Sequence, residues 1–361
     1  MTAQRGAGGR GLASLGVGIL GTGEVAGEYI KAFRDHPATE IVGAYNRSPG
    51  RAGALLETLH VDAREYSHED ELFEDAAVDI VVSCTPPDAR PKHVLRAAQT
   101  DRHIVIEKPV ALTMEEVELI RRAVATAGVK TVTSFVLRWN PMIETIRKLI
   151  DDGIIGELVY AEADYWNPGN PEPPRPWWAT KAGAGSAFLE GGCHAADAIR
   201  HLAGEVAEVA AFSSPAKRSP LYEYDPVVVA SLKFENGAVG KLSTVLDADT
   251  PYTFNIRLVG TEGTIQNNRV FSSKHYPGAL DYWEFPTVLP NSTDVTHHPF
   301  GRQIAHFVEC LAKGVESHAS IHDTYKSMAL VFAIEESLAA GGKPTSISQV
   351  IETAATASPF S

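Results

Sequence analysis

Over the first part of the chain, short apolar runs alternate with stretches in which apolar residues recur at helical spacing. The apolar runs, interpreted as strands, are Gly16–Leu20, Glu40–Tyr45, Ile80–Ser83, His103–Ile106 and Lys130–Phe135. The stretches between them, interpreted as helices, are Val25–Arg34, Ala52–Leu59, Pro91–Gln99 and Met114–Ala127. Continuous apolar strands that alternate with amphipathic helices are typical of a parallel sheet covered by helices on both faces. We therefore predict a doubly wound α/β domain over residues 14–131.

The pattern changes beyond this domain, where residues 132–361 are predicted to form an α+β domain. Its expected helices are Met142–Asp151, Cys193–Leu202, Gly301–Ala312 and Asp323–Ala340. Between Glu205 and Gln266 apolar runs follow one another as strands, and Asn236-Gly237 between two of them is a strong hairpin signal. These features predict a mostly antiparallel sheet. The Gly- and Arg-rich residues 1–13 are expected to be disordered.

The charge balance is acidic, with 32 Lys and Arg against 45 Asp and Glu and a formal net charge of −13. Such a charge disfavours nucleic acid and anionic membranes as partners. No apolar run reaches the ~18 residues of a membrane span. The cysteines Cys84, Cys193 and Cys310 lack CxxC spacing, so we expect neither a disulfide framework nor a thiolate zinc site. Reduced thiols are typical of the cytoplasm, which is the expected location.

The first strand runs into Gly21-Thr22-Gly23-Glu24-Val25-Ala26, which opens the first helix. This is the GxGxxG/A pattern in the strand–turn–helix setting of a Rossmann-type domain. The first Gly permits a tight turn, the second lets the backbone approach a pyrophosphate, and Ala keeps helix and strand close. The helix N-terminus favours the phosphates. The residues predicted to contact a dinucleotide here are Gly21, Gly23, Glu24, Val25 and Ala26; the alternative is a purely structural turn.

The end of the second strand bears on the choice between NAD and NADP. An acidic residue commonly holds the ribose hydroxyls of NAD at this point, but the chain has Asn46. Arg47 and Ser48, with Arg51 nearby, are suited to a 2′-phosphate because a guanidinium pairs well with phosphate oxygens. The sequence therefore leans slightly toward NADP. The alternative is NAD bound through Asn46, with Arg47 in solvent.

Four segments together resemble the glucose-fructose oxidoreductase / inositol dehydrogenase family, the Gfo/Idh/MocA group, over residues 14–347. These segments are Val82–Pro87, Glu107–Pro109, Phe135–Pro141 and Ala184–Asp197. The resemblance implies a Rossmann domain followed by a domain with an open-faced sheet. It also implies cofactor contacts at Thr85, Pro86 and Glu107, and catalytic roles for Lys108 and His194.

The chain departs from the family pattern at three positions. Glu190 stands where the family usually has Asp, four residues before His194. Arg90 stands where the family often has His, and His93 follows three residues later. Asp101 replaces a usual Gly. Glu190 keeps the negative charge of Asp on a longer side chain.

Hydride transfer from a secondary alcohol needs a base for the hydroxyl proton and a cation near the developing alkoxide. His194 is suited to be the base, since the pKa of a free His is about 6.5. Lys108 is suited to stabilise the oxygen, or to be the base itself if burial depresses its pKa. Glu190 is expected to orient His194 or to bind a substrate hydroxyl. A metal site of His194, Glu190 and Asp197 is not expected, because their spacing is not a ligand pattern.

The Pro-, Gly- and Trp-rich segment Asn167–Gly185 combines aromatic faces with polar groups, as carbohydrate sites do. The predicted substrate contacts are Arg138 (by resemblance), Tyr165, Asn167, Trp178 and Asp197. The alternatives are a segment packed on its own domain or on a neighbour and, for Asp197, a structural hydrogen bond. The expected substrate is a sugar, cyclitol or glycoside.

The sequence is compatible with three functions. The first is an NAD(P)-dependent oxidoreductase that interconverts a secondary alcohol and a ketone. The second is a glycosidase or lyase that oxidises its substrate transiently with bound NAD, and the third is a non-catalytic nucleotide-binding regulator. Lys108 and His194 disfavour the third. The open sheet would expose an apolar face, so a homodimer or homotetramer through that sheet is expected.

Overall fold

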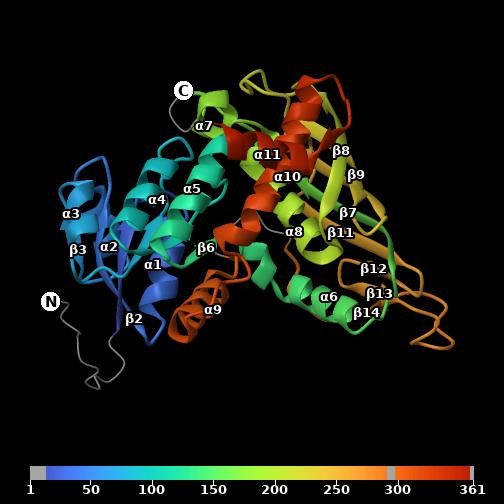
Figure 1. The fold of residues 1–361 in the computed structure, drawn as a ribbon, viewed down its shortest axis with the longest axis horizontal. Helices are drawn as coiled ribbons and strands as arrows, with labels where there is room; N and C mark the ends of the chain where they lie inside the picture. The colour runs from blue at the N-terminus through green and yellow to red at the C-terminus, as the bar shows by residue number, and fades with distance from the viewer. Residues whose placement is uncertain (1–13, 291–296, 358–361) are drawn as a thin grey trace.

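The computed structural model describes residues 14–290 and 297–357, and it has two lobes (Figure 1). The predicted disorder of residues 1–13 falls outside the described residues. The N-terminal lobe is built on a six-stranded sheet and the C-terminal lobe on a nine-stranded sheet. This arrangement confirms the predicted fold class, a doubly wound parallel sheet followed by an α+β unit.

The N-terminal sheet is parallel throughout, with strand order β3-β2-β1-β4-β5-β6. Its strands are β1 (Leu15–Leu20), β2 (Thr39–Tyr45), β3 (Arg64–Tyr66), β4 (Ile80–Ser83), β5 (His103–Ile106) and β6 (Thr131–Thr133). Its helices are α1 (Ala26–Arg34), α2 (Arg51–Thr58), α3 (Glu69–Glu74), α4 (Arg90–Gln99) and α5 (Met114–Ala127). Strand order reverses between β1 and β4, and ligands of doubly wound sheets bind at the carboxyl ends of the strands at such a switch point.

The C-terminal sheet has the order β14-β13-β12-β11-β7-β10-β9-β8-β15 and is antiparallel except where β7 and β10 pair. Its strands are β7 (Leu158–Trp166), β8 (Val206–Ser214), β9 (Val227–Phe234), β10 (Val239–Val245), β11 (Thr253–Gly260), β12 (Thr264–Gln266), β13 (Arg269–Phe271), β14 (Trp283–Glu284) and β15 (Thr345–Ser346). The predicted hairpin joins β9 to β10. Sequence reasoning missed β7, the strand in the middle of the sheet.

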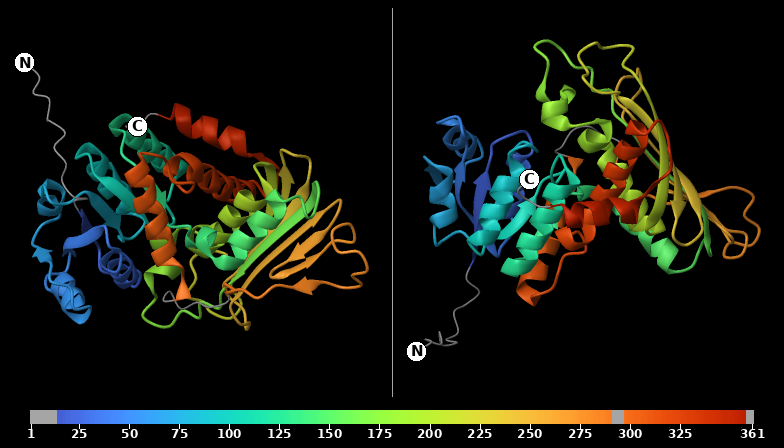
Figure 2. Two further views of the ribbon diagram at one scale, coloured as in Figure 1. Left: turned by 90° about the horizontal axis from the view of Figure 1, so that it is seen from below. Right: turned by 45° about the horizontal axis from the view of Figure 1, so that its top comes forward.

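The two lobes share one hydrophobic core, and the remaining helices all follow β6 along the chain. They are η1 (Val136–Trp139), α6 (Pro141–Asp151), η2 (Trp177–Ala179), α7 (Lys181–Ala184), η3 (Phe188–Gly192), α8 (Cys193–Ala203), α9 (Phe300–Lys313), α10 (Ile321–Ala339) and α11 (Ile347–Thr356). Helix α8 lies against β7, while α10 contacts α5, α8 and β8 and lies between the lobes (Figure 2). Helix α9 returns to the N-terminal lobe and packs on α1.

The outer face of the C-terminal sheet, which no helix of the described chain covers, is mixed rather than uniformly apolar. Its middle carries a network in which Lys241 lies 3.1 Å from Asp164 and Arg257 lies 3.4 Å from Glu162. Toward β8 the face also carries exposed apolar side chains, among them Phe212 and Val229. The prediction of an exposed apolar face therefore holds for part of the sheet.

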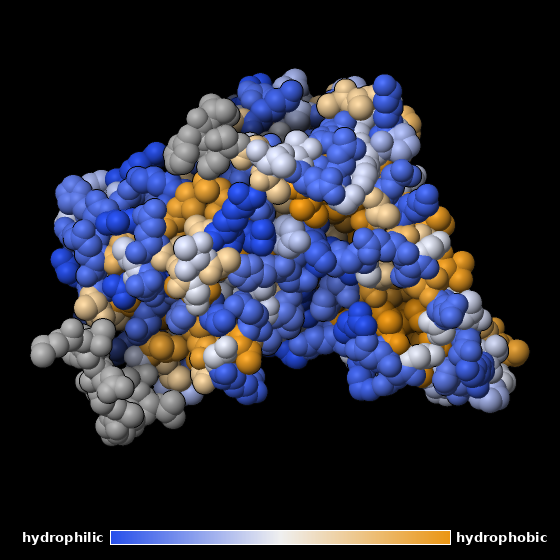
Figure 3. Space-filling view, viewed as in Figure 1, coloured by the Kyte–Doolittle hydropathy of each residue, from blue (hydrophilic) through white to orange (hydrophobic). Residues whose placement is uncertain are grey.

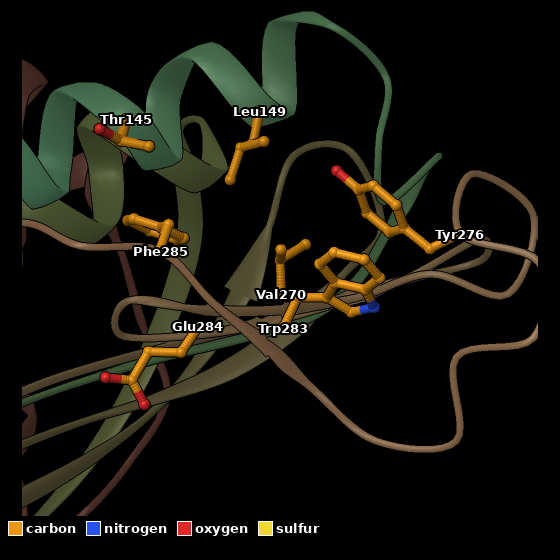
Figure 4. A pocket seen from close by; sticks show the side chains of 7 residues that line it. All are labelled: Thr145, Leu149, Val270, Tyr276, Trp283, Glu284 and Phe285. Atoms are coloured by element: carbon orange, nitrogen blue, oxygen red, sulfur yellow. The ribbon is translucent and has the colours of Figure 1, made fainter.

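A pocket of about 190 Å³ opens between α6 and the β13–β14 hairpin (Figure 4). Leu149 of α6 faces Val270, Tyr276 and Trp283, and Tyr276 stacks on Trp283 at 5.5 Å between ring centroids. Figure 3 shows hydrophobic colour gathering over this end of the sheet. The pocket lining contains none of the residues that the sequence predicts for the active site.

Candidate active site

The glycine turn lies at the switch point, where β1 ends beside β4. Gly21 has φ +90°, and a Cβ there would stand 2.9 Å from the Cys84 carbonyl oxygen, so this position requires glycine. Gly23 is exposed and has open space around it, while Ala26 is fully buried. No side chain caps the start of α1. Nothing in the described chain hydrogen-bonds the buried Thr22 hydroxyl oxygen, so a donor and a free helix N-terminus stand where phosphates are expected.

At the end of β2, the Asn46 side chain braces the turn. Its amide oxygen accepts a hydrogen bond from the Thr22 N–H at 3.3 Å, and its amide nitrogen donates to the Ser48 carbonyl at 3.2 Å. Arg47 and Ser48 are exposed beside it, and Arg51 is the first residue of α2. Within the described ranges, no ion pair engages Arg47 or Arg51.

The Glu107 carboxylate is used inside the fold. It is buried, accepts a hydrogen bond from the Tyr29 hydroxyl at 2.7 Å and accepts another from the Lys108 N–H at 3.0 Å. Thr85, at the end of β4, lies within 3.2 Å of both the Ser83 hydroxyl and His93 Nδ1. Both contacts of Glu107 shape the turn that carries Lys108, and its predicted cofactor contact stays a prediction.

Lys108, Glu190 and His194 meet where the two lobes join. Lys108 Nζ donates a hydrogen bond to the Glu190 carbonyl oxygen at 2.7 Å, so it binds the backbone rather than the carboxylate. Glu190 lies in the π-helical turn η3, and His194 is the second residue of α8. Such π-helical turns occur frequently at functional sites. The His194 ring stacks on Tyr165 at 5.9 Å, and no described residue hydrogen-bonds its buried Nδ1.

The electrostatics give the three groups different protonation preferences. Burial lowers the pKa of His194 well below its ordinary value, and the positive charge of Lys108 lowers it further. His194 is therefore neutral at neutral pH and able to accept a proton. Burial also lowers the pKa of Lys108, but the neighbouring Cys193, Glu190 and Glu107 more than offset this and raise it overall. Lys108 thus stays a cation, which favours oxygen stabilisation over the role of base.

The third group is the Glu190 carboxyl. Burial raises the pKa of Glu190 above its ordinary value, and the charge of Lys108 opposes that rise. Lys108 contacts the Glu190 backbone and not its carboxyl, so the predicted contact of that carboxyl with a substrate hydroxyl stays a prediction. The hydrogen bond to the Glu190 backbone carbonyl also ties the C-terminal lobe to the turn that carries Lys108.

Aromatic side chains surround these three residues. Tyr165 meets Tyr252 edge to face at 5.7 Å, and Trp178 lies 6.1 Å from Tyr222. Asn167 donates to the Tyr165 hydroxyl at 3.3 Å. Burial raises the pKa of Tyr222, Tyr224 and Tyr252, three tyrosines that sequence reasoning missed. The charge of Glu190 adds to this rise, and for Tyr252 the neighbouring Tyr165 contributes more than Glu190 does. They lie outside any motif, and their aromatic character alone was the available signal.

Two predicted substrate contacts, Arg138 and Asp197, bind each other instead. Arg138 Nη2 lies 2.6 Å from Asp197, and both side chains are almost fully buried. Arg138 also pairs with Asp323 of α10 at 2.7 Å, and Ser327 donates to Asp197 at 2.6 Å. This network holds η1, α8 and α10 together. We therefore leave both residues out of the substrate site proposed below.

Two further features concern metals and membranes. Within residues 14–290 and 297–357, no group of three or more His, Cys, Asp or Glu side chains is placed to hold a metal ion. The same part of the chain contains no helix that is long and apolar enough to cross a membrane. Cys84, Cys193 and Cys310 are buried free thiols.

Comparison with known proteins assigns the family. A family model described as an oxidoreductase family with an NAD-binding Rossmann fold matches residues 15–135, and the GFO/IDH/MocA C-terminal domain matches residues 143–266. The chain belongs to the GFO/IDH/MocA oxidoreductases. This confirms the family resemblance found in the sequence and establishes the N-terminal lobe as an NAD-binding Rossmann fold.

Several relatives of this GFO/IDH/MocA protein are named dehydrogenases. It is 27% identical over 328 residues to inositol 2-dehydrogenase of Rhizobium meliloti, covering 89% of this chain and 96% of the relative. It is 25% identical over 310 residues to scyllo-inositol 2-dehydrogenase (NAD(+)) of Bacillus subtilis, covering 82% and 86%. In fold it is similar to levoglucosan dehydrogenase in complex with NADH and levoglucosan, with a TM-score of 0.82, 24% identity and coverage of 92% and 99%.

The structure gives physical reasons for two departures from the GFO/IDH/MocA pattern. Asp101 adopts φ +59°, a left-handed conformation that Gly adopts freely and that Asp tolerates better than most residues. Arg90 is buried, and it hydrogen-bonds the carbonyl oxygens of Thr85 and Pro109. The first departure is therefore local to a turn, while the second reaches the segment that carries Lys108.

Proposed function

We propose that this protein is an NAD(P)-dependent dehydrogenase or reductase that interconverts a secondary alcohol and a ketone. The observation that carries the proposal is the meeting of a cationic Lys108 with Glu190 beside a neutral, buried His194 at the junction of the lobes. The NAD-binding family supports the redox chemistry. The expected cofactor contacts are those predicted at the glycine turn, at Asn46–Ser48 and at Thr85–Glu107.

In the proposed mechanism each residue has one task. His194 accepts the hydroxyl proton as the C–O bond becomes a carbonyl, and returns it in the reverse direction. Lys108 stabilises the developing negative charge on that oxygen. Glu190 binds and orients a neighbouring hydroxyl, and the tyrosines exclude water. A bound nicotinamide supplies the hydride acceptor in oxidation and the hydride donor in reduction.

We propose a neutral polyhydroxylated ring, such as a cyclitol or sugar, as the substrate. The named relatives act on inositols, and a further relative, from Pseudarthrobacter phenanthrenivorans, is a levoglucosan dehydrogenase at 28% identity over 225 residues. Tyr165, Tyr252 and Trp178 provide ring faces for the C–H side of such a substrate, while Asn167 and Glu190 provide polar partners. This is a mixed apolar and polar lining of the kind that small-molecule sites use.

A nicotinamide-absorbance screen against cyclitols, sugars and glycosides tests the proposal, after measurement of any cofactor that copurifies. With the substrate so found, we expect Lys108→Ala and His194→Ala each to lower kcat by ~10²–10⁴, the range for a lost general acid/base. Cofactor affinity should change far less. The exposed Lys92→Ala serves as a matched control. Wild-type turnover in both variants would refute these assignments.

One relative supports a second candidate, a hydratase or lyase that oxidises its substrate only transiently. The chain is 26% identical over 258 residues to 2,7-anhydro-N-acetylneuraminate hydratase of Escherichia coli, covering 70% of this chain and 67% of the relative. Such an enzyme would convert substrate without net change in nicotinamide absorbance. Chromatography of the products alongside the absorbance assay therefore separates the two functions.

For the cofactor we propose a slight preference for NADP. The support is the absence of an acid at Asn46 and the exposed, unpaired state of Arg47 and Arg51 within the described chain. We expect Arg47→Ser to raise the Kd for NADPH more than that for NADH, because the guanidinium pairs with the 2′-phosphate. Fluorescence titration of both nucleotides measures this, with Arg34→Ser as control. Tighter binding of NADH than NADPH by the wild type would overturn the preference.

We further propose that the protein works in the cytoplasm as a homodimer or homotetramer. Three buried free thiols are the support for a reducing compartment. Apolar residues on the outer face of the C-terminal sheet are the support for self-association.

A further inference from the structure

Arg90 opens α4 and lies beneath the turn that carries Lys108. Its side chain is buried, with the residue 4% exposed. Nη2 donates to the Thr85 carbonyl oxygen at 2.6 Å, and Nη1 donates to the Pro109 carbonyl oxygen. One guanidinium therefore bridges the end of β4 to the residue immediately after Lys108.

Burial of the Arg90 guanidinium is energetically unfavourable. A buried charge costs free energy unless it is paired and hydrogen-bonded, and no described carboxylate hydrogen-bonds this guanidinium. Nε has no partner among the described residues. Glu107 is near enough to favour the charged form, although burial lowers the pKa of Arg90. A residue needed only for packing would not require such a group, so the two backbone contacts point to a specific purpose.

The same turn is held from its other side by Glu107. That carboxylate accepts the Lys108 N–H and is fixed in turn by the Tyr29 hydroxyl. The backbone of Lys108 is thus restrained before the residue through Glu107 and after it through Pro109. With its backbone fixed, Lys108 extends Nζ across the junction to Glu190.

We propose that Arg90 is a positioning residue that clamps the Lys108 turn against the end of β4 and so sets where the Lys108 ammonium stands. The proposal rests on the proposed function, in which Lys108 stabilises the reacting oxygen. A planar guanidinium reaches two carbonyls at a fixed separation, which an ammonium or an imidazole does not do equally well. Arg90 is also a nearby positive charge, and it lowers the pKa of Lys108.

Two substitutions separate the clamp from the charge. Arg90→Lys keeps the positive charge but loses the planar guanidinium that reaches both carbonyls. Arg90→Gln loses both the charge and the guanidinium. We expect Arg90→Gln to lower kcat ~10²-fold, the scale of a misplaced catalytic group, with a smaller change in substrate KM. Arg90→Lys should lower kcat by a smaller factor. Arg96→Gln, at a partly exposed position of the same helix, is the matched control and should match the wild type.

The pH profile provides a readout that a purely structural role would not move. Activity falls as pH rises through the pKa of Lys108, whose charged form is needed. The other titratable groups that face Lys108, namely Glu190, Glu107, Cys193, His194 and Tyr252, are unchanged in the variants. The alkaline limb of kcat/KM should therefore move to higher pH in Arg90→Gln, because a neighbouring positive charge is gone, and should stay in place in Arg90→Lys.

The outcomes decide between the alternatives. Wild-type kcat in a folded Arg90→Gln, or a loss of kcat with an unmoved alkaline limb and an equal loss of NADH binding, would overturn the positioning role. If Arg90→Gln does not fold, as judged by its Tm, wild-type kcat in Arg90→Lys would overturn it instead. Full activity of Lys108→Ala would refute the proposed function itself, independently of Arg90.

Discussion

At the residue scale, the protonation of His194 depends on Lys108. Burial and the Lys108 charge both lower the pKa of His194, so the imidazole stays neutral from neutral pH down to its lowered pKa and charges only below it. We expect Lys108→Met to raise the pKa of His194, because a neighbouring positive charge is removed. NMR titration of the His194 ring in the cofactor-free protein measures the shift. Lys130→Met, whose ammonium pairs with Glu316, is the control.

Some features of this candidate site could be predicted from the sequence and others could not. The motif positions Lys108 and His194 were predictable because each lies at a fixed place in a recognisable segment, and the structure brings them together. That Lys108 contacts the backbone of Glu190 was not predictable, since it depends on the π-helical turn. Tyr252 was missed because its place in the site arises from β11 pairing with β7, a long-range contact.

At the scale of elements, a buried ion network holds η1, α8 and α10 together. Arg138 pairs with Asp197, Arg200 hydrogen-bonds Ser327, and both arginines reach Asp323. Asp323 has its pKa lowered to about 2: burial alone would raise it, but the two arginines outweigh burial. This lowered pKa means that its contribution to stability is present above the unfolded pKa and is lost as pH falls from about 4 toward 2.

Asp197→Asn should destabilise the fold by ~1.5–3 kcal/mol, the scale of a hydrogen bond to a charged group, because Arg138 then keeps only the partly exposed Asp323 as a carboxylate partner. Urea unfolding measures the change. Asp151→Asn, in an exposed pair with Arg147, is the control and should cost ~0–1 kcal/mol. An unchanged free energy of unfolding together with a raised substrate KM would instead support a contact between Asp197 and the substrate.

Element prediction succeeded where periodicity was clean and failed where the outer sheet face is polar. Strands β4 and β5 and helix α5 match the predicted bounds residue for residue, since each is a continuous apolar run or a capped amphipathic helix. Strand β7 was missed because Glu162 and Asp164 interrupt its apolar character. Their polarity is explained by the sheet, which pairs them with Lys241 and Arg257 on neighbouring strands.

At the scale of the whole molecule, the domain boundary predicted at residue 131 does not separate the two lobes completely, because part of the chain beyond it packs on the N-terminal lobe. Helix α9 lies far along the chain, yet it packs on α1 with Phe300 against Tyr29 at 4.8 Å. Tyr29 in turn holds Glu107. Sequence patterns give the existence of such a helix but not its destination, because the choice of lobe depends on tertiary contacts. The C-terminal region therefore supports, through Tyr29 and Glu107, the turn that carries Lys108.

An exposed apolar pair on the C-terminal sheet is where we expect copies of the chain to associate. On the outer face of the C-terminal sheet, Phe212 of β8 and Val229 of β9 are directly paired and are 67% and 43% exposed. Exposed apolar residues side by side usually mark an interface. The charged network occupies the middle of the face, so this apolar pair lies to one side of it.

We expect light scattering of the wild type to give two or four times the chain mass of 38.8 kDa. Replacing Phe212 and Val229 together with Glu should shift the mass toward that of one chain, because two copies would then bury unpaired charges against each other. Val315→Glu, at an exposed apolar position beyond α9, tests whether any new surface charge has this effect. A wild type of single-chain mass would refute self-association, and an unchanged mass in the double variant would move the interface elsewhere.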